Sequence, residues 1–320
     1  MARREPGLHH GPGASPPSSP QATRRARPPA HISHVMGDDR LVLDAPREFH
    51  HRQADAVSLV AAKAGRTVTV CLPARDEQAT VGTIVASIVG ALTGRGGGVA
   101  LVDQVLVVDD QSVDATAAHA RRAGADVVRT GSGAGGKGAA MRLALEHAEG
   151  DLVVFVDADI ENFSPHFVTG LLLPLLSCDD VALVKGHYRR PLAGQPGEGG
   201  RVTELVARPV LDLLFPHLSG IRQPLAGETA APRAVLDKVG LADGYGVEIG
   251  LLLDIADRFG AGAIAQVDLG TRVHRNRPLA ELRPQAADVL RTALGRAGVT
   301  RGGPTRAGVT RGGPTRAGVS

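Results

Sequence analysis

Short apolar runs alternate with longer alanine-rich segments through the first half of the chain. The runs occupy residues 68–72, 105–108, 126–128 and 152–156 and are rich in β-branched side chains. Their length and composition predict buried strands, and the segments between them have the length of helices. This alternation predicts an α/β domain in which helices cover both faces of a mostly parallel sheet.

The second half of the chain is less regular. Its apolar patterns predict strands over residues 181–185 and 264–269 and helices over residues 202–215 and 246–259. We interpret this half as a continuation of the same domain that builds the second side of its ligand site.

The two ends of the chain differ from the middle. Residues 1–46 are rich in Pro, Arg, Gly and Ser, a composition that predicts a disordered tail. Residues 296–320 repeat the decapeptide RAGVTRGGPT, whose glycine and proline predict a flexible basic tail rather than a solenoid. One folded domain over residues 47–295 is expected between these tails.

Composition narrows the class of protein. The chain has 320 residues, of which 43% are hydrophobic, enough for a substantial core. Its net charge of +3 is small, and much of the arginine lies in the tails, so no nucleic-acid partner is expected. The two cysteines, Cys71 and Cys178, favour a reducing cytoplasm over a disulfide framework. The longest apolar stretch is interrupted by Gly170 and Pro174 and is too short to cross a membrane, so no membrane partner is expected.

Polar residues follow each of the four strands predicted in the first half. They are residues 73–77, residues 109–112, the glycine-rich loop that leads to Lys137, and residues 157–159. Because the carboxyl ends of parallel strands meet at one edge of a sheet, this edge is the expected ligand site.

Asp157 and Asp159 are the most informative pair. Two carboxylates at the end of a buried strand suit a hard divalent cation and the diphosphate that such a cation coordinates. Solvated acids at a strand end are the alternative. A phosphatase with two spaced aspartates is a second alternative, disfavoured because Glu161 stands where that motif has threonine.

The glycine-rich loop and Asp110 suit other parts of a nucleotide ligand. Backbone N–H groups and the Lys137 ammonium can approach phosphate or sugar oxygens, although the loop is not a P-loop because no Ser or Thr follows the lysine. A flexible connection is the alternative. Asp110 is placed to hold part of a nucleoside, whereas Asp114 more simply caps a helix.

Two later segments carry candidate chemistry. His274 follows the last predicted strand, and its imidazole would complete a metal shell begun by Asp159, unless the histidine is structural. Gly200, Arg201 and Thr203 begin a helix, where N–H groups, a guanidinium and a hydroxyl suit a small anion. An ordinary capped helix start is the alternative.

The order of these segments resembles that of the GT-A glycosyltransferases: PARDEQATVG, DDQSVD, the glycine-rich lysine loop and VFVDAD. Over residues 61–294 the chain further resembles the glucosyl-3-phosphoglycerate synthase family, through VKGHYRRPL, GGRVTELVARPVL, QPLAGE, GYGVEIGLLLD, AIAQVDLG and HRNRPL. The resemblance implies a GT-A fold with a donor half at about 61–160 and an acceptor half at about 161–295. It also implies a homodimer that transfers glucose from UDP-glucose to the 2-hydroxyl of 3-phosphoglycerate, with retention, using Mg²⁺ or Mn²⁺.

The resemblance assigns a role to each matching residue. Uridine would be held by Pro73, Ala74, Glu77 and Asp110, and the diphosphate and glucose by Lys137, Asp157 and Ala158. Glu248 and Tyr245 would hold the glucose hydroxyls, and Asp159 and His274 the metal. The acceptor's phosphate and carboxylate would be held by Gly200, Arg201, Thr203 and Asn276. Glu248, Asp157 and Lys137 are the residues expected to act in catalysis. The sequence offers no clear carboxylate nucleophile, so same-face attack is favoured and Glu248 is expected to orient the sugar.

The chain departs from the family pattern at a few positions. Ala158 stands where the family has serine, Asp110 replaces another serine, and the repeat replaces the family's C-terminal tail. Related activities remain alternatives: a mannosyl-3-phosphoglycerate synthase, a polyprenyl-phosphate glycosyltransferase, or a catalytically silent nucleotide-sugar-binding protein.

Overall fold

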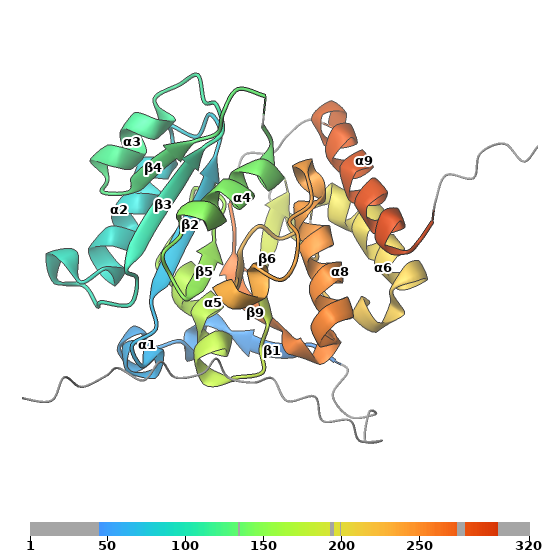
Figure 1. Ribbon diagram of the computed structural model, residues 1–320, viewed down its shortest axis with the longest axis horizontal. Helices are drawn as coiled ribbons and strands as arrows, with labels where there is room; N and C mark the ends of the chain where they lie inside the picture. The colour runs from blue at the N-terminus through green and yellow to red at the C-terminus, as the bar shows by residue number, and fades with distance from the viewer. Residues whose placement is uncertain (1–44, 134, 193–194, 199, 274–278, 300–320) are drawn as a thin grey trace, which may run out of the picture. The chain divides into compact units, whose positions relative to one another are not determined.

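The computed structural model describes residues 45–133, 135–192, 195–198, 200–273 and 279–299 (Figure 1). Its strands are β1 (Arg47–His50), β2 (Val68–Ala74), β3 (Gln104–Asp109), β4 (Asp126–Arg129), β5 (Leu152–Phe155), β6 (Leu183–Leu192), β7 (Gln195–Glu198), β8 (Thr229–Pro232) and β9 (Ile264–Thr271). Its α-helices are α1 (Ala56–Lys63), α2 (Val81–Leu92), α3 (Thr116–Arg122), α4 (Lys137–His147), α5 (His166–Ser177), α6 (Arg208–Leu214), α7 (Arg233–Leu236), α8 (Val247–Phe259) and α9 (Leu279–Arg296).

The strands form one sheet in the order β1-β9-β6-β8-β5-β2-β3-β4, and β7 pairs with β6. The strands β5, β2, β3 and β4 are parallel to one another, as are β1, β9 and β6. The antiparallel β8 joins these two blocks. The six predicted strands are all present, and the predicted mostly parallel α/β sheet is confirmed.

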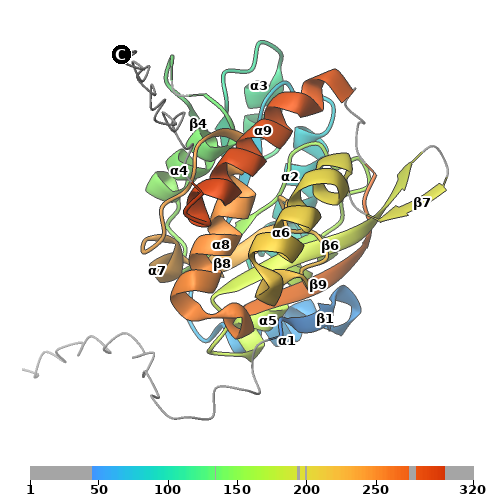
Figure 2. The same ribbon diagram turned by 90° about the vertical axis from the view of Figure 1, so that its right-hand side faces the viewer.

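Alternate side chains of each buried strand enter two different cores. Val68, Val70 and Leu72 of β2 pack on one face, whereas Cys71 packs on the other. The first core contains apolar residues of α1, α2 and α5, and the second contains those of α4, α6, α8 and α9. Figure 2 shows α6, α8 and α9 together over one part of the sheet. A strand covered on both faces reads as a continuous apolar run, which is why periodicity predicted these strands.

The structure adds elements that the apolar patterns did not predict. Strand β8 has the sequence TAAP, which lacks the β-branched run on which the strand predictions depended. Helix α9 buries only Val289 and Ala293 among its described residues, so its apolar face is narrow. The helix predicted over residues 202–215 is observed as a π-helical turn, Thr203–Ala207, that continues into α6.

Within the described ranges, five single 3₁₀ turns accompany these elements: His51–Gln53, Arg95–Gly97, Pro216–Leu218, Gly244–Gly246 and Ala261–Ala263. Among the described residues, no helix combines the length and apolar character needed to span a bilayer. Residues 1–44 and 300–320, which hold most of the two predicted tails, lie outside the described part of the chain.

Candidate functional site

The polar ends of β2 and β3 meet at one edge of the sheet. Ala74, the last residue of β2, accepts a hydrogen bond from the backbone N–H of Asp110 at 2.8 Å. Pro73 precedes it in β2, and the N–H of Glu77 donates to Thr116 Oγ1 at 2.8 Å. The residues predicted to hold a nucleoside therefore line adjacent strand ends.

Asp110 connects this edge to the glycine-rich loop. Its side chain is buried and accepts hydrogen bonds from Thr130 Oγ1 and from the N–H of Gly136, both at 2.9 Å. Gly136 immediately precedes Lys137, the first residue of α4. One carboxylate thus fixes the position at which the lysine enters the site.

Lys137 joins the two halves of the chain. Its Nζ lies 2.7 Å from Asp157 Oδ1 and 2.5 Å from Glu248 Oε1. Glu248 is buried in the first turn of α8, whereas Asp157 follows β5. Burial alone would lower the pKa of Lys137, but the two carboxylates outweigh burial and raise that pKa above its usual value. The lysine therefore stays charged.

Arg272, which follows β9, is the centre of a second group of ion pairs, beside the group around Lys137. Its Nη2 lies 3.0 Å from Asp157 Oδ2 and 2.5 Å from Asp159 Oδ1. Its Nη1 lies 3.1 Å from Oε1 of Glu228, a side chain with no exposed surface. Burial acts to raise the pKa of Asp157, but Lys137 and Arg272 outweigh it and hold that pKa well below its usual range.

Tyr188 and Lys185, both in β6, support this group of ion pairs. The Tyr188 hydroxyl accepts hydrogen bonds from Arg272 at 2.7 Å and from Arg190 at 2.6 Å. Burial raises the pKa of Tyr188 to about 12, so its proton remains in place. Lys185 is almost completely buried and donates to the carbonyl of Ala226 at 2.6 Å. Burial lowers the pKa of Lys185 to about 8.

The segment QPLAGE, residues 223–228, forms a wall against Asp157. Gly227 lies so close to the Asp157 carboxylate that an added Cβ would overlap it. Lys185 holds the preceding carbonyl of Ala226, and Glu228 follows with its contact to Arg272. The position of Asp157 is therefore set by residues far apart in the sequence.

The carboxylates of Asp157 and Asp159 converge on one positive charge, the Nη2 group of Arg272. Oxygen ligands converging on a single cationic point suit Mg²⁺ or Mn²⁺, so these residues fit the predicted metal. Asp159 is one of the two predicted metal ligands. The other, His274, lies outside the described residues.

The predicted acceptor residues begin the helical segment that leads to α6. The carbonyl of Gly200 accepts a hydrogen bond from the N–H of Glu204 at 3.0 Å, and Thr203 is buried. Gly200 also lies against the guanidinium of Arg190, where an added Cβ would come within 2.9 Å of Nη1. Arg190 in turn packs over the Tyr188 ring, with 4.9 Å between Cζ and the ring centroid. Asn276 lies outside the described residues.

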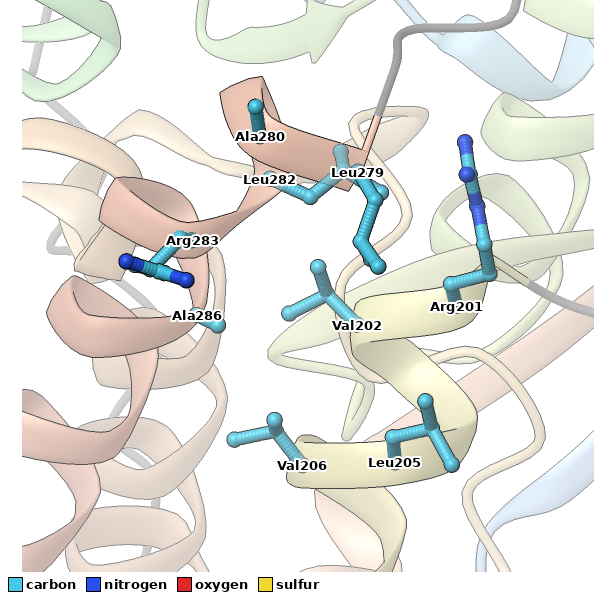
Figure 3. Close-up of a pocket in the computed structure, with 9 residues that line it drawn as sticks. All are labelled: Arg201, Val202, Leu205, Val206, Leu279, Ala280, Leu282, Arg283 and Ala286. Atoms are coloured by element: carbon cyan, nitrogen blue, oxygen red, sulfur yellow. The ribbon is translucent and has the colours of Figure 1, made fainter.

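A cavity of about 430 Å³ lies beside Arg201, between this helical segment and the start of α9 (Figure 3). Seven of its nine lining residues are apolar, and the other two are Arg201 and Arg283. Its lining includes none of the five carboxylates described above. The cavity therefore lies outside the group of ion pairs around Asp157.

Tyr245 lies one turn before Glu248, in the 3₁₀ turn that leads into α8. Its backbone N–H donates to Asp288 Oδ2 of α9 at 3.3 Å. Ala158, between the two aspartates, is buried, and its carbonyl accepts a hydrogen bond from Thr80 Oγ1 at 2.6 Å. The backbone of the aspartate motif is thus anchored without the family's serine.

The structure brings Lys137, Asp157, Asp159 and Glu248 together; the strand-end argument predicted the first three, and the resemblance implied Glu248. The residues that surround them were not predicted from the sequence: Lys185, Tyr188, Arg190, Glu228 and Arg272. Arg272 had one available signal, because it follows a predicted strand. No sequence signal identifies Glu228 or Lys185, because a polar residue in an apolar stretch does not reveal its partner.

The sequence is similar to those of enzymes with a known activity. The glucosyl-3-phosphoglycerate synthase of Mycolicibacterium paratuberculosis is 48% identical over 273 residues, which cover 81% of this chain and 81% of that protein. The chain belongs to the glucosyl-3-phosphoglycerate synthase family. The family's member from Petrotoga mobilis is 40% identical, over 78% of this chain and 80% of that protein.

Solved structures of the glucosyl-3-phosphoglycerate synthase family share the fold. The Mycobacterium tuberculosis enzyme in complex with Mn²⁺, UDP-glucose and phosphoglyceric acid has a TM-score of 0.73 at 44% identity, covering 81% of this chain and 89% of that chain. The same enzyme with Mg²⁺ and UDP has a TM-score of 0.71 at 44% identity, covering 80% of this chain and 88% of that one. Residues 69–197 also match the glycosyl transferase family 2 profile, so the chain is a GT-A glycosyltransferase.

Proposed function

We propose that this chain is a metal-dependent glucosyl-3-phosphoglycerate synthase that transfers glucose from UDP-glucose to the 2-hydroxyl of 3-phosphoglycerate. The observation that carries the proposal is Lys137, whose Nζ contacts Asp157 of the donor half and Glu248 of the acceptor half. A transferred sugar must lie between donor and acceptor, and these three side chains meet there. Relatives of that name at 46–49% identity support the choice of substrates.

A divalent ion held by Asp159 and His274 would offset the negative charge on the departing UDP. Asp157 positions the donor, because Lys137 and Arg272 fix its two oxygens in place. Its low pKa keeps it an anion throughout the working pH range. On the nucleoside side, Pro73, Ala74, Glu77 and Asp110 surround uridine at the ends of β2 and β3.

Glu248 orients glucose by accepting hydrogen bonds from its hydroxyls, with Tyr245 nearby. Lys137 pairs with the Glu248 carboxylate and adds positive charge close to the diphosphate. This arrangement suits same-face attack with retention, because Glu248 is already paired and acts as a hydrogen-bond acceptor. Normal turnover of UDP-glucose by the Glu248→Gln variant would contradict this role.

The acceptor site is formed by Gly200, Arg201, Thr203 and Asn276. Arg190 is a further candidate, because its guanidinium lies against Gly200 and its buried Nε has no hydrogen-bond partner among the described residues. A guanidinium and helix-terminal N–H groups suit the phosphate and carboxylate of 3-phosphoglycerate. The enzyme is further proposed to be a cytoplasmic homodimer.

One assay tests the proposed function. UDP release from UDP-glucose is measured with and without 3-phosphoglycerate, Mg²⁺ or Mn²⁺, and the product's anomeric configuration is read by NMR. Release that needs both metal and 3-phosphoglycerate, with an α-glucoside as product, is the expected result. Faster release from GDP-mannose, or with polyprenyl phosphate as acceptor, would replace the proposal by one of its relatives. No release from any UDP-, GDP- or ADP-sugar would leave a nucleotide-sugar-binding protein.

A further inference from the structure

A second group of metal-ligating side chains lies apart from the carboxylate cluster, where the edge strand β1 pairs with β9. His50, His51 and Asp268 each offer one ligand atom, and these atoms all lie within 4.8 Å of one another. The register pairs His50 directly with Asp268. Asp268 of β9 stands four residues before Arg272, which follows the strand, roughly 13 Å away along an extended chain.

The tautomer of His51 is set for metal binding. Its Nδ1 lies 2.9 Å from the backbone carbonyl of Asp268, which only accepts hydrogen bonds, so Nδ1 carries the proton. The lone pair of the neutral ring is therefore on Nε2. Metal-ligating histidines almost always donate their other N–H to a carbonyl or carboxylate in this way.

The ring of His51 is also held in one orientation. Added Cβ atoms at Gly170 and Gly270 would come within 3.2 Å of His51 Cβ and 3.4 Å of its Cε1. The His166 ring lies on it, with 4.4 Å between ring centroids. A ligand whose orientation is fixed before the ion arrives loses little freedom on binding.

Asp268 contributes both a carboxylate ligand and a backbone carbonyl that holds His51. Its Oδ1 accepts a hydrogen bond from the N–H of Gly270 at 2.7 Å, which fixes the carboxylate. Its carbonyl orients His51, as described above. A carboxylate beside two imidazoles suits Zn²⁺, Co²⁺ or Ni²⁺ better than Mg²⁺.

His50 makes one exposed hydrogen bond that an ion would displace. Its Nδ1 accepts the N–H of Arg52 at 3.1 Å, as the cap of the turn His51–Gln53. The second capping bond, from the His50 N–H to Gln53 Oε1 at 2.7 Å, does not involve the ring and is retained. Binding an ion therefore requires only that the His50 ring exchange its hydrogen bond from Arg52 for the ion.

Two neighbouring histidines border the site without joining it. His166 has both nitrogens engaged, Nδ1 with Ser164 and Nε2 with the carbonyl of Leu269. The Nε2 of His187 lies 3.3 Å from Glu48 Oε2. With both His166 nitrogens engaged and the His187 Nε2 facing Glu48, the ligand set is His50, His51 and Asp268, and water completes the coordination shell.

We propose that His50, His51 and Asp268 form a binding site for a borderline divalent ion such as Zn²⁺ or Co²⁺, separate from the proposed catalytic metal. An ion bound there joins β1 and the turn that follows it to β9. Its role is structural, because the sheet edge at β1 is held by one neighbouring strand.

Co²⁺ titration of the full-length protein, followed by visible absorption, tests this site. The variants are His51→Gln and Asp268→Asn, with His147→Gln as a control on α4, where the histidine contacts the carbonyl of Leu143. We expect wild type and His147→Gln to bind one more Co²⁺ equivalent than the other two variants. Zn²⁺ should raise the melting temperature of wild type more than that of His51→Gln or Asp268→Asn.

Circular dichroism and glucosyl transfer with Mg²⁺ show whether each variant is folded, so that a loss of binding is not mistaken for unfolding. Equal Co²⁺ stoichiometry and affinity in wild type, His51→Gln and Asp268→Asn would overturn the proposal, because the bound ion would then belong to other histidines of the chain. Loss of transfer in all four proteins would count against the proposed function and leave the Co²⁺ comparison intact.

Discussion

The two sides of the candidate site hold their acids in different ways. On the side of β2, β3 and β4, Asp110 is paired with the hydroxyl of Thr130 and the N–H of Gly136, partners 20 and 26 residues away. On the side of β5, β8 and β9, Asp157 and Glu228 are held by Arg272, which lies 115 and 44 residues away respectively. Two neutral donors hold Asp110, and its one arginine contact, 3.9 Å from Nη1 of Arg75, is largely exposed, whereas buried ion pairs support the second side.

This difference determines how each side should respond to change. A carboxylate held by neutral donors can be replaced by an amide with a modest loss, since shape and half of the hydrogen bonding remain. A buried ion pair that loses one partner leaves a charge without compensation. We therefore expect the second side to be far less tolerant, and the following predictions test that contrast.

Arg272→Met should have the largest effect. It leaves Glu228, Asp157 and Asp159 without their shared cation, so the free energy of unfolding should fall by about 3–5 kcal/mol and transfer should be lost. Urea denaturation and UDP release measure the two effects.

Arg296→Met is the matched control for that loss. Its ion pair with Asp254 joins α9 to α8 at a more exposed position, and its removal should cost about 1 kcal/mol or less. Similar losses of unfolding free energy in Arg272→Met and Arg296→Met would contradict the proposed contrast between the two sides of the site.

Lys137→Met should lower kcat by about 100-fold or more, because it removes the positive charge between donor and sugar. Lys137→Arg keeps the charge and should recover part of that loss. Steady-state kinetics with both substrates varied separates kcat from KM. An unchanged kcat would show that the lysine holds the loop without acting on the donor.

Lys185→Met should change how stability depends on pH. The folded-state pKa of Lys185 is about 8, below its usual 10.5, so between these values the unfolded chain binds more protons than the folded one. The stability of wild type relative to the variant should therefore increase as pH rises from about 8 to about 10.5, and stay constant below pH 7. Urea denaturation at pH 7, 8.5 and 10 measures this, and a flat difference would contradict it.

Asp110→Asn should have the smallest effect. The amide oxygen still accepts one of the two hydrogen bonds, so stability should fall by about 1 kcal/mol and the KM for UDP-glucose should rise about fivefold. Asp126→Asn, at the exposed start of β4, is the control and should behave as wild type. A loss of transfer as large as that expected for Arg272→Met would show that Asp110 contacts the charged part of the donor.

Much of the first side could be predicted from sequence. Val68–Ala74, Gln104–Asp109 and Leu152–Phe155 are apolar runs that end in polar motifs, and parallel strands bring such motifs to one edge. Asp157, Asp159 and Lys137 were therefore identified together. Glu248 followed from the resemblance, and the structure places it against Lys137.

The second side could not be predicted in this way. Strand β8 has no β-branched run, yet it carries Glu228 to the site because it is inserted between β5 and β6. Lys185 looked like part of an apolar strand, and only its contact with Ala226 reveals its role. The pairing of His51 with Asp268 likewise depends on β1 lying next to β9, strands more than 200 residues apart.

The sequence by itself determined the parallel strands, their covering helices and the acids at their ends, because periodicity and strand-end chemistry are local properties of the chain. The tertiary structure alone decided that Arg272 compensates Asp157, Asp159 and Glu228 at once. A buried charge requires its partners within a few ångströms whatever their distance in sequence, and only the packed sheet supplies that proximity.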